Sequence, residues 1–290
     1  MTLLYVTSAQ PGQGRTGVAA ALARHFAYAG QPTRLVRLEE PEANAAADAA
    51  WFATLEFAPG SPASPQAAVP AADGELLVVE GPSAAIPAGA QVVFVQRKAA
   101  PASFPAGTAA CVVTAVPRLR GARRKDGTPA LVELGEDRTL AGFALDEALA
   151  LLHGQLIVPG DVPPDATSDH LVIAPIGSDA GQPYFRRFPS MTVVARFDRT
   201  DMHLAALRAS PNALILTGGR QPSGYTIDAA SASGVPVVLS RTDTENTVIA
   251  LERVFERTRF RGERKLERMA ELLDSVEFAA LVGVPAPAAS

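Results

Sequence analysis

The sequence has little of what several classes of protein need. Its single cysteine, Cys111, excludes an internal disulfide and, with two valines beside it, predicts a buried thiol in a strand. No apolar run approaches the roughly 18 residues of a membrane helix, so we expect no membrane partner. The N-terminal residues carry neither a basic leader nor a cleavage-site pattern, which predicts a cytoplasmic protein.

An excess of basic residues is missing as well. The 26 Lys and Arg residues face 30 Asp and Glu residues, so the formal net charge is −4 and no nucleic-acid partner is expected. The four histidines show no metal-ligand spacing, and one cysteine cannot complete a usual zinc site. No nucleophile elbow or Ser-His-Asp order occurs. We therefore assign no catalytic residue.

What the sequence does contain is apolar material in an alternating pattern of strands and helices. Hydrophobic residues make up 48% of 290, which is enough for two domains. Strand-length apolar runs recur, and most are separated by enough residues for a crossover helix, as parallel pairing requires. These runs lie near residues 3–7, 34–38, 76–80, 92–96 and 111–116, and again near 156, 171–176, 192–196, 213–217 and 235–240.

This pattern predicts an α/β fold with two domains. A P-loop NTPase-like parallel sheet is expected over residues 1–150, and a smaller α/β domain over residues 151–260. A C-terminal helix and tail are expected over residues 261–290, where apolar residues recur at helical spacing.

A glycine loop (residues 9–17) follows the first strand and leads into a helix rich in Ala and Leu. Such a loop binds phosphate when its backbone N–H groups and those of the helix N-terminus converge on an anion. The Walker A pattern requires Gly and Lys where Ala9 and Arg15 stand, whereas Gly14 and Thr16 match it. The candidate nucleotide-binding residues are Gly12, Gln13, Gly14, Arg15, Thr16 and Gly17. The alternative is a tight strand-to-helix turn that binds no ligand.

Two features bear on ATP turnover at this loop. Arginine is longer than lysine and its head is planar and forked, so Arg15 cannot simply replace the lysine that reaches the β- and γ-phosphates. Glu80 ends the apolar strand near residues 76–80, at the edge where ligands of open α/β sheets bind. We name Thr16 and Glu80 as candidate ligands of Mg²⁺. The alternative, that Glu80 caps the next turn, has equal weight.

These residues resemble the dethiobiotin-synthetase-like P-loop domain at the front of long phosphate acetyltransferases. That family reads roughly T-E-P-G-S-G-K-S after its first strand and D-L-V-L-V-E-G further on. This sequence has S-A-Q-P-G-Q-G-R-T at residues 8–16 and E-L-L-V-V-E-G at residues 75–81. The resemblance implies ATP or another adenine nucleotide, with Mg²⁺, as ligand. The acetyltransferase catalytic domain does not follow in this sequence, so no transacetylase activity is expected.

The C-terminal half resembles the DRTGG domain, named for its D-R-T and G-G letters. Here D-R-T-D stands at residues 198–201 and T-G-G at residues 217–219, each just after a predicted strand. In related proteins this domain is regulatory, and in some it binds adenine nucleotides. The resemblance implies these candidate binding residues: Asp198, Arg199, Thr217, Gly218 and Gly219. The alternative is a packing and oligomerisation domain in which Asp198 and Arg199 pair with each other.

Three functions remain open at this point. The preferred one is a regulatory protein that binds a nucleotide or phosphate through a degenerate P-loop and is at most a weak NTPase. The second is an ATP-dependent ligase resembling dethiobiotin synthetase or cobyrinic acid a,c-diamide synthase. The third is an interaction module that binds no nucleotide. A homo-oligomer is expected as well, and soluble homo-oligomers are most often symmetric dimers.

Overall fold

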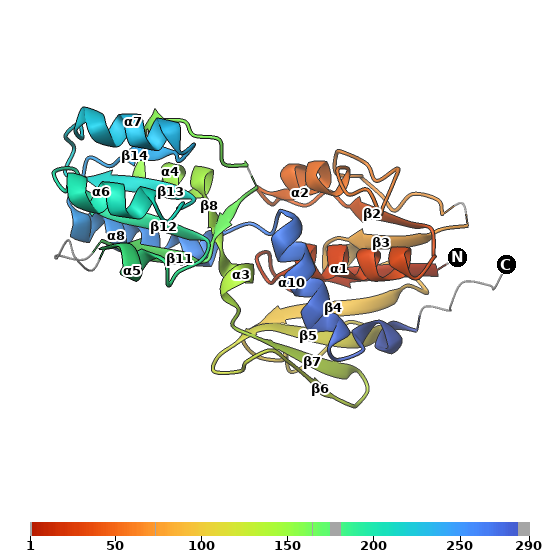
Figure 1. The fold of residues 1–290 in the computed structure, drawn as a ribbon. Helices are drawn as coiled ribbons and strands as arrows, with labels where there is room; N and C mark the ends of the chain where they lie inside the picture. The colour runs from red at the N-terminus through yellow and green to blue at the C-terminus, as the bar shows by residue number, and fades with distance from the viewer. Residues whose placement is uncertain (1, 73, 164, 175–180, 284–290) are drawn as a thin grey trace. The chain divides into compact units, whose positions relative to one another are not determined.

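Two compact units make up the chain, of which a computed structural model describes residues 2–72, 74–163, 165–174 and 181–283 (Figure 1). One unit is Met1–Leu140 with Glu263–Ser290, and the other is Ala141–Gly262. Both units are mixed α/β, as the alternating pattern predicts. Residues 175–176 of the predicted strand near 171–176, and residues 284–290 of the predicted tail, lie outside the described residues.

The division of the chain differs from the expected boundaries near residues 150 and 260. Helix α4 (Leu145–Leu152) belongs to the second unit, because it packs Ala148 into a core with Val194 and Ile215 of that unit's sheet. Helix α10 (Glu263–Asp274) lies across helix α1 (Arg15–Tyr28) of the first unit (Figure 1). The C-terminal helix is therefore an integral part of the first unit.

A seven-stranded sheet forms the centre of the first unit, in the order β2-β3-β1-β4-β5-β7-β6. All neighbouring strands are parallel except β6, which runs antiparallel to β7 at the edge. The inner strands are buried and apolar on both faces, as parallel strands covered by helices must be. The strands are β1 (Thr2–Thr7), β2 (Thr33–Arg37), β3 (Leu76–Glu80), β4 (Gln91–Arg97), β5 (Thr108–Val116), β6 (Ala122–Lys125) and β7 (Ala130–Gly135).

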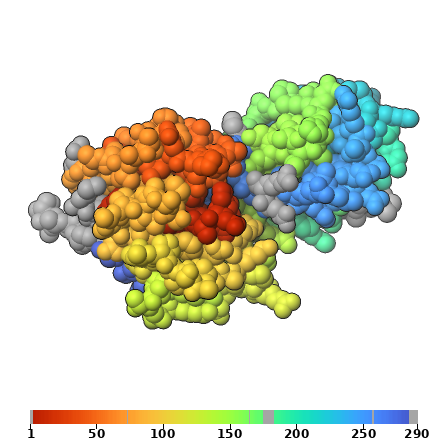
Figure 2. Space-filling model, turned by 180° about the vertical axis from the view of Figure 1, so that it is seen from behind, coloured from red at the N-terminus to blue at the C-terminus, as the bar shows by residue number. Residues whose placement is uncertain are grey.

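Helices and a long surface segment cover this sheet. Helix α1 follows β1 directly, and the other helical elements of the unit are α2 (Ala45–Phe52), η1 (Ser83–Ala85), α10 and η3 (Phe278–Val282), with α3 (Arg138–Ala141) at the end of the first segment. Residues 59–72 contain no helix or strand and lie on the surface (Figure 2, orange). Gln66 fastens this segment to the end of β2, because its backbone N–H donates to the Arg37 carbonyl and its carbonyl accepts from Glu39.

A smaller sheet of five strands, in the order β11-β12-β13-β14-β9, forms the second unit. Alternate residues of its central strands enter two different cores, as the pleat of a strand requires. Val193 and Leu214 pack against α6 and α7, whereas Val194 and Ile215 pack against α4 and α8. The sheet is therefore the middle of three layers.

The remaining elements of the second unit are short. They are β8 (Phe143–Ala144), β9 (Gln155–Val158), β10 (Thr167–Ser168), β11 (His170–Ile173), α5 (Gly181–Phe185), β12 (Met191–Arg196), α6 (Thr200–Leu207), β13 (Ala213–Thr217), α7 (Gly224–Ala232), β14 (Val237–Leu239), α8 (Thr244–Glu252) and α9 (Val254–Arg257). Among the described residues, no helix combines the length and the apolar character that crossing a bilayer demands.

The glycine after β3 allows a close contact that fixes the end of this strand. A Cβ atom on Gly81 would collide with the Tyr5 hydroxyl and would lie 3.0 Å from Cδ1 of Leu38. The Tyr5 ring cannot easily move away, because its hydroxyl donates a hydrogen bond of 2.9 Å to the Pro82 carbonyl.

We expect Gly81→Ala to destabilise the first unit by about 1–3 kcal/mol, the usual cost of overpacking a filled core. Fluorescence of Trp51, the single tryptophan, reports on this unit during denaturant unfolding because it lies in α2. The control is Gly127→Ala, where the nearest atom to the added methyl is 3.4 Å away. Equal unfolding midpoints for the two variants would contradict the packing argument.

Candidate functional site

The glycine loop joins β1 to α1 at the carboxyl edge of the seven-stranded sheet. Gly12 and Gly14 have backbone φ angles of 74° and 96°, which favour glycine. Gln13 fastens the loop to two neighbouring strands: its side-chain Oε1 accepts from the Arg97 N–H, and its carbonyl accepts from the Thr114 hydroxyl, both at 2.8 Å. The loop is thus held in one shape by the ends of β4 and β5.

The backbone N–H groups of residues 12–17 have no acceptor among the described residues. Helix α1 begins at Arg15, and its first-turn N–H groups have no intrahelical partner because they precede the first full turn. These donors and the positive end of the helix dipole suit an anion. The loop therefore has the backbone features of a phosphate cradle.

Arg15 points into the protein, where carboxylates surround it. Its side chain is only 3% exposed. One terminal nitrogen, Nη2, lies 2.6 Å from Oε2 of Glu40 and 2.8 Å from Oε2 of Glu42. The other, Nη1, donates to Oε1 of Glu40 at 3.2 Å and to the Gly81 carbonyl at 3.3 Å. The Arg15 guanidinium, which we expected to bind a phosphate, is thus hydrogen-bonded to acidic side chains of the chain itself.

A second arginine completes what we call the arginine–carboxylate cluster: Arg15, Arg37, Glu40, Glu42 and Glu80. Arg37, the last residue of β2, is buried, and its Nη2 lies 2.6 Å from Oε2 of Glu42 and 3.2 Å from Oε2 of Glu40. Burial raises the pKa of Glu40, but the hydrogen bond from Arg15 and the charges of both arginines outweigh burial, so the pKa is lowered overall. Glu40 therefore stays ionised beside the two cations.

Thr16 and Glu80, the candidate metal ligands, do lie together. The Thr16 hydroxyl donates to Oε1 of Glu80 at 3.1 Å, and Oε2 of Glu80 is buried without a hydrogen-bond partner. The Nε atoms of Arg15 and Arg37 lie 3.5 and 3.7 Å from the same Oε1. Two guanidinium charges already face this oxygen and oppose a divalent cation. Among the described residues, no group of three or more His, Cys, Asp or Glu side chains is arranged to hold a metal ion.

The D-R-T stretch of the second unit lies just past β12, where its charged residues pair locally. Asp198 accepts from Arg196 at 2.7 and 3.1 Å, and Asp201 accepts from Arg199 at 2.9 and 3.0 Å. The packing alternative expected Asp198 and Arg199 to pair with each other. Instead, each of them pairs with a different neighbour. These pairs are exposed to solvent, where such pairs add little stability.

Gly218 and Gly219, after β13, serve the packing of the loop in which they lie. Their N–H groups donate to the carbonyls of Thr242 and Ser240 at 2.7 and 3.0 Å, so neither N–H is left for a ligand. Both have positive φ angles, and a Cβ atom on Gly218 would lie 2.9 Å from the Phe197 ring. Thr217 is buried, and its hydroxyl shares a 2.8 Å hydrogen bond with that of Thr244.

Sequence reasoning missed the partners of Arg15. Glu40 and Glu42 follow β2 and lie far from the glycine loop in the sequence. The one available signal was the acidic E-E-P-E run of residues 39–42, placed at the carboxyl end of a predicted strand beside the loop. That edge position brings the run to Arg15.

Comparison with known proteins identifies the second unit. Residues 147–254 match the sequence profile of the DRTGG domain, so a DRTGG domain is present in this chain. The predicted strands near residues 192–196 and 213–217, which precede its two motifs, are confirmed.

One solved structure is similar to part of the chain. It is the crystal structure of the CBS and DRTGG domains of the regulatory region of Clostridium perfringens pyrophosphatase, complexed with the activator diadenosine tetraphosphate. The match is 17% identical, covers 44% of this chain and has a TM-score of 0.36. It spans 56% of the other chain, little more than half of its length. The TM-score is too low for a residue-by-residue comparison.

Glu80 gives the first unit a distinctive dependence on pH. Burial raises the pKa of its carboxyl to about 7, although the Arg37 and Arg15 guanidinium groups act in the opposite direction. A carboxyl whose pKa is higher in the folded state binds its proton more tightly there. Stability from this group is therefore greatest when it is protonated and is lost as the pH rises towards and past 7.

We expect the unfolding free energy of the first unit to fall by roughly 2–3 kcal/mol between about pH 5 and pH 8, and Glu80→Gln to remove most of that fall. Trp51-monitored denaturant unfolding at both pH values measures it. Glu133→Gln is the control. The pKa of Glu133 is lowered from its ordinary value, chiefly by the hydrogen bond from Lys125, so removing this carboxyl should leave the fall between these two pH values unchanged. A Glu80→Gln variant that keeps the wild-type pH dependence would contradict this assignment.

Proposed function

We propose that this protein is a regulatory protein that binds a nucleotide or another phosphate-bearing ligand at its glycine loop and turns over ATP weakly or not at all. The observation that carries the proposal is the arrangement at the start of α1. The backbone N–H groups of the loop have no acceptor in the described chain, whereas the Arg15 side chain beside them is engaged by Glu40 and Glu42.

The binding half of the proposal rests on backbone chemistry. A phosphate group interacts with loop N–H donors and with the helix dipole, and neither depends on the residue at position 15. Helix α1 is 14 residues long, and the loop before it is fixed by Gln13. The resemblance to dethiobiotin-synthetase-like domains favours a nucleotide as the source of the phosphate.

The weak-turnover half rests on charge. Phosphoryl transfer is accelerated mainly by cations that stabilise the charge on the transferred group. In this chain the cation of the loop is bidentate on Glu40, and withdrawing it would leave Glu40 and Glu42 with less positive charge to pair with. Breaking a buried pair of this kind is costly, about 3–5 kcal/mol. We therefore assign the loop to ligand binding rather than catalysis.

The regulatory part of the proposal rests on the DRTGG domain. That domain fills most of the second unit. In long phosphate acetyltransferases, which the chain resembles, the corresponding domains precede the catalytic domain and have a regulatory role. A ligand bound by the first unit would then act as a signal rather than as a substrate.

We expect ATP and ADP to raise the melting temperature of the full chain with or without Mg²⁺, and Gly12→Glu to abolish that rise. Ligand at about a hundredfold excess over Kd stabilises a folded protein by roughly 2.7 kcal/mol. In the variant, the new carboxylate would occupy the phosphate site or repel the phosphate. Thermal-shift titration with ATP, ADP and AMP, each with Mg²⁺ or with EDTA, makes the measurement.

The matched control is Gly89→Glu, since Gly12 and Gly89 have similar φ angles, 74° and 79°, and neither has an atom within 4 Å of an added Cβ. Gly89 precedes β4, at the opposite end of the sheet from the loop. Loss of the shift in both variants would indicate general destabilisation. A shift that survives Gly12→Glu but disappears in Arg199→Ala would move the site to the D-R-T stretch, with Asp198, Gly218 and Gly219. No shift at all would favour the interaction module.

The ligase remains a second candidate because Thr16 and Glu80 do lie within hydrogen-bond distance. We expect ATP hydrolysis at background level in the wild type, and no increase in Arg15→Lys, because the Glu40 and Glu42 carboxylates would still attract a cation at this position. A phosphate-release assay with and without Mg²⁺ measures this. Mg²⁺-dependent turnover in the wild type that Thr16→Ala removes would support the ligase instead.

A further inference from the structure

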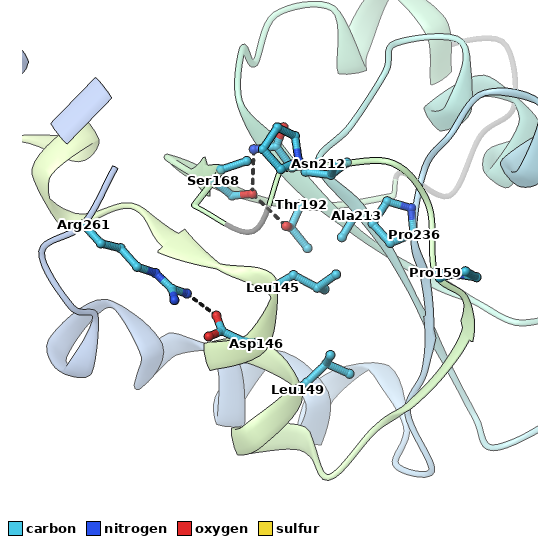
Figure 3. Close-up of a pocket in the computed structure, with 13 residues that line it drawn as sticks. Leu145, Asp146, Leu149, Pro159, Ser168, Thr192, Asn212, Ala213, Pro236 and Arg261 are labelled. Carbon is cyan, nitrogen blue, oxygen red and sulfur yellow. Dashed lines mark hydrogen bonds and ion pairs between the residues drawn. The ribbon is translucent and has the colours of Figure 1, made fainter. Parts of the chain in front are cut away.

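A partly open cavity of about 220 Å³ lies in the second unit, at the edge of its sheet opposite the D-R-T and G-G stretches. Thr192, Ala213 and Pro236 line it from the amino ends of β12, β13 and β14 (Figure 3). Most of the remaining lining is apolar and includes Leu145 and Leu149 of α4. The cavity belongs to none of the sites discussed above, and no residue of the glycine loop contributes to it.

A chain of three polar side chains ends in this cavity. The Asn212 Nδ2 group donates to the Thr167 carbonyl at 2.9 Å and to the Ser168 hydroxyl at 3.2 Å. The Ser168 and Thr192 hydroxyls lie 2.8 Å apart, and both side chains are 2% exposed. Two hydroxyls that share one hydrogen bond leave one hydroxyl hydrogen over, and within the described chain that hydrogen has no other acceptor. One hydroxyl of the Ser168–Thr192 pair can therefore donate a hydrogen bond to a ligand in the cavity, which a buried donor favours.

A cation lies on another side of the same cavity. Arg261 donates through Nη2 to Oδ1 of Asp146, and its Nε is buried without a hydrogen-bond partner among the described residues. In Figure 3, Thr192 lies on one side of Leu145, and the Arg261–Asp146 pair lies on the other. The Asp146 side chain is 61% exposed and that of Arg261 only 15%, so Asp146 can turn to water while Arg261 stays at the cavity.

We propose that this cavity binds a small monocarboxylic acid with an apolar body. The carboxylate would accept from the spare hydroxyl of the Ser168–Thr192 pair and from Arg261, and the body would pack against the leucines of α4. A cavity of about 150 Å³ lined by apolar side chains is known to take up benzene, so this larger one has room for a ring with a carboxylate. Charge-assisted hydrogen bonds favour the acid over a neutral molecule of the same shape.

This inference does not rest on the proposed nucleotide function. The ligand carries no phosphate, and the cavity lies in the other unit of the chain. Failure of one proposal therefore leaves the other untouched, provided that the titrations use separate ligands.

Benzoate is the probe, with benzamide and toluene as neutral molecules of related shape. Amide chemical-shift changes in the full chain, followed by ¹H–¹⁵N correlation spectra, give the Kd of each. We expect benzoate to bind at least fivefold more tightly than either neutral probe. Thr192→Val should weaken benzoate about five- to tenfold, and Thr192→Ser, which keeps the hydroxyl, should restore binding.

A second variant tests the cavity without touching its polar groups. Ala166→Leu fills part of the space and should abolish binding of all three probes, whereas Ala232→Leu, at an exposed position at the end of α7, should not. Benzoate binding that is absent, or that is equal in the wild type, Thr192→Val and Ala166→Leu, would overturn the proposal. Equal affinity for benzoate and toluene would overturn the assignment to a carboxylic acid.

Discussion

Burying two arginines beside the glycine loop imposes a constraint on everything around them. Charges taken out of water cost several kcal/mol each unless partners of opposite sign are held in good geometry. Arg15 begins α1 and Arg37 ends β2, while their partners come from the segment after β2 and from the last residue of β3. The cluster therefore ties together four parts of the chain at one edge of the sheet. The glycine loop, which we propose to bind an anion, is therefore anchored at the start of α1 by buried ion pairs.

The two edges of the second unit's sheet differ in what they offer a ligand. At the carboxyl edge, the glycine N–H groups and the threonine hydroxyls are used in hydrogen bonds within the chain, and the charged residues pair with close neighbours. At the amino edge, a largely apolar cavity is lined by the Ser168 and Thr192 hydroxyls and by Arg261, whose Nε has no hydrogen-bond partner among the described residues. The D-R-T and G-G motifs and the groups available to a ligand thus lie at opposite ends of the same strands.

Much of the fold could be predicted from the sequence, because buried parallel strands are apolar along their whole length. Runs such as Leu76–Glu80 and Ala213–Thr217 have no other plausible place in a folded chain. The edge strand β6 escaped detection because Arg123 to Lys125 are exposed and stabilised by ion pairs with Glu133 rather than by burial. The place of the candidate metal pair was also predictable, since a strand end and a helix start beside it must be close. The partners of Arg15 were not, because nothing local determines which carboxylates a long side chain reaches.

The return of the chain to its first unit has a consequence for how the protein is made. Helix α10 packs on α1 and is held there by two side-chain hydrogen bonds. His25 donates to Asp274 at 2.9 Å, and Arg268 donates to Asp137 at 2.8 Å. Domains generally fold as units during synthesis, the N-terminal one first. Here the ribosome delivers the whole of Ala141–Gly262 before it delivers α10. The second unit can therefore fold while the face of α1 that α10 covers is still exposed. The first unit, whose synthesis begins first, is the last to finish folding.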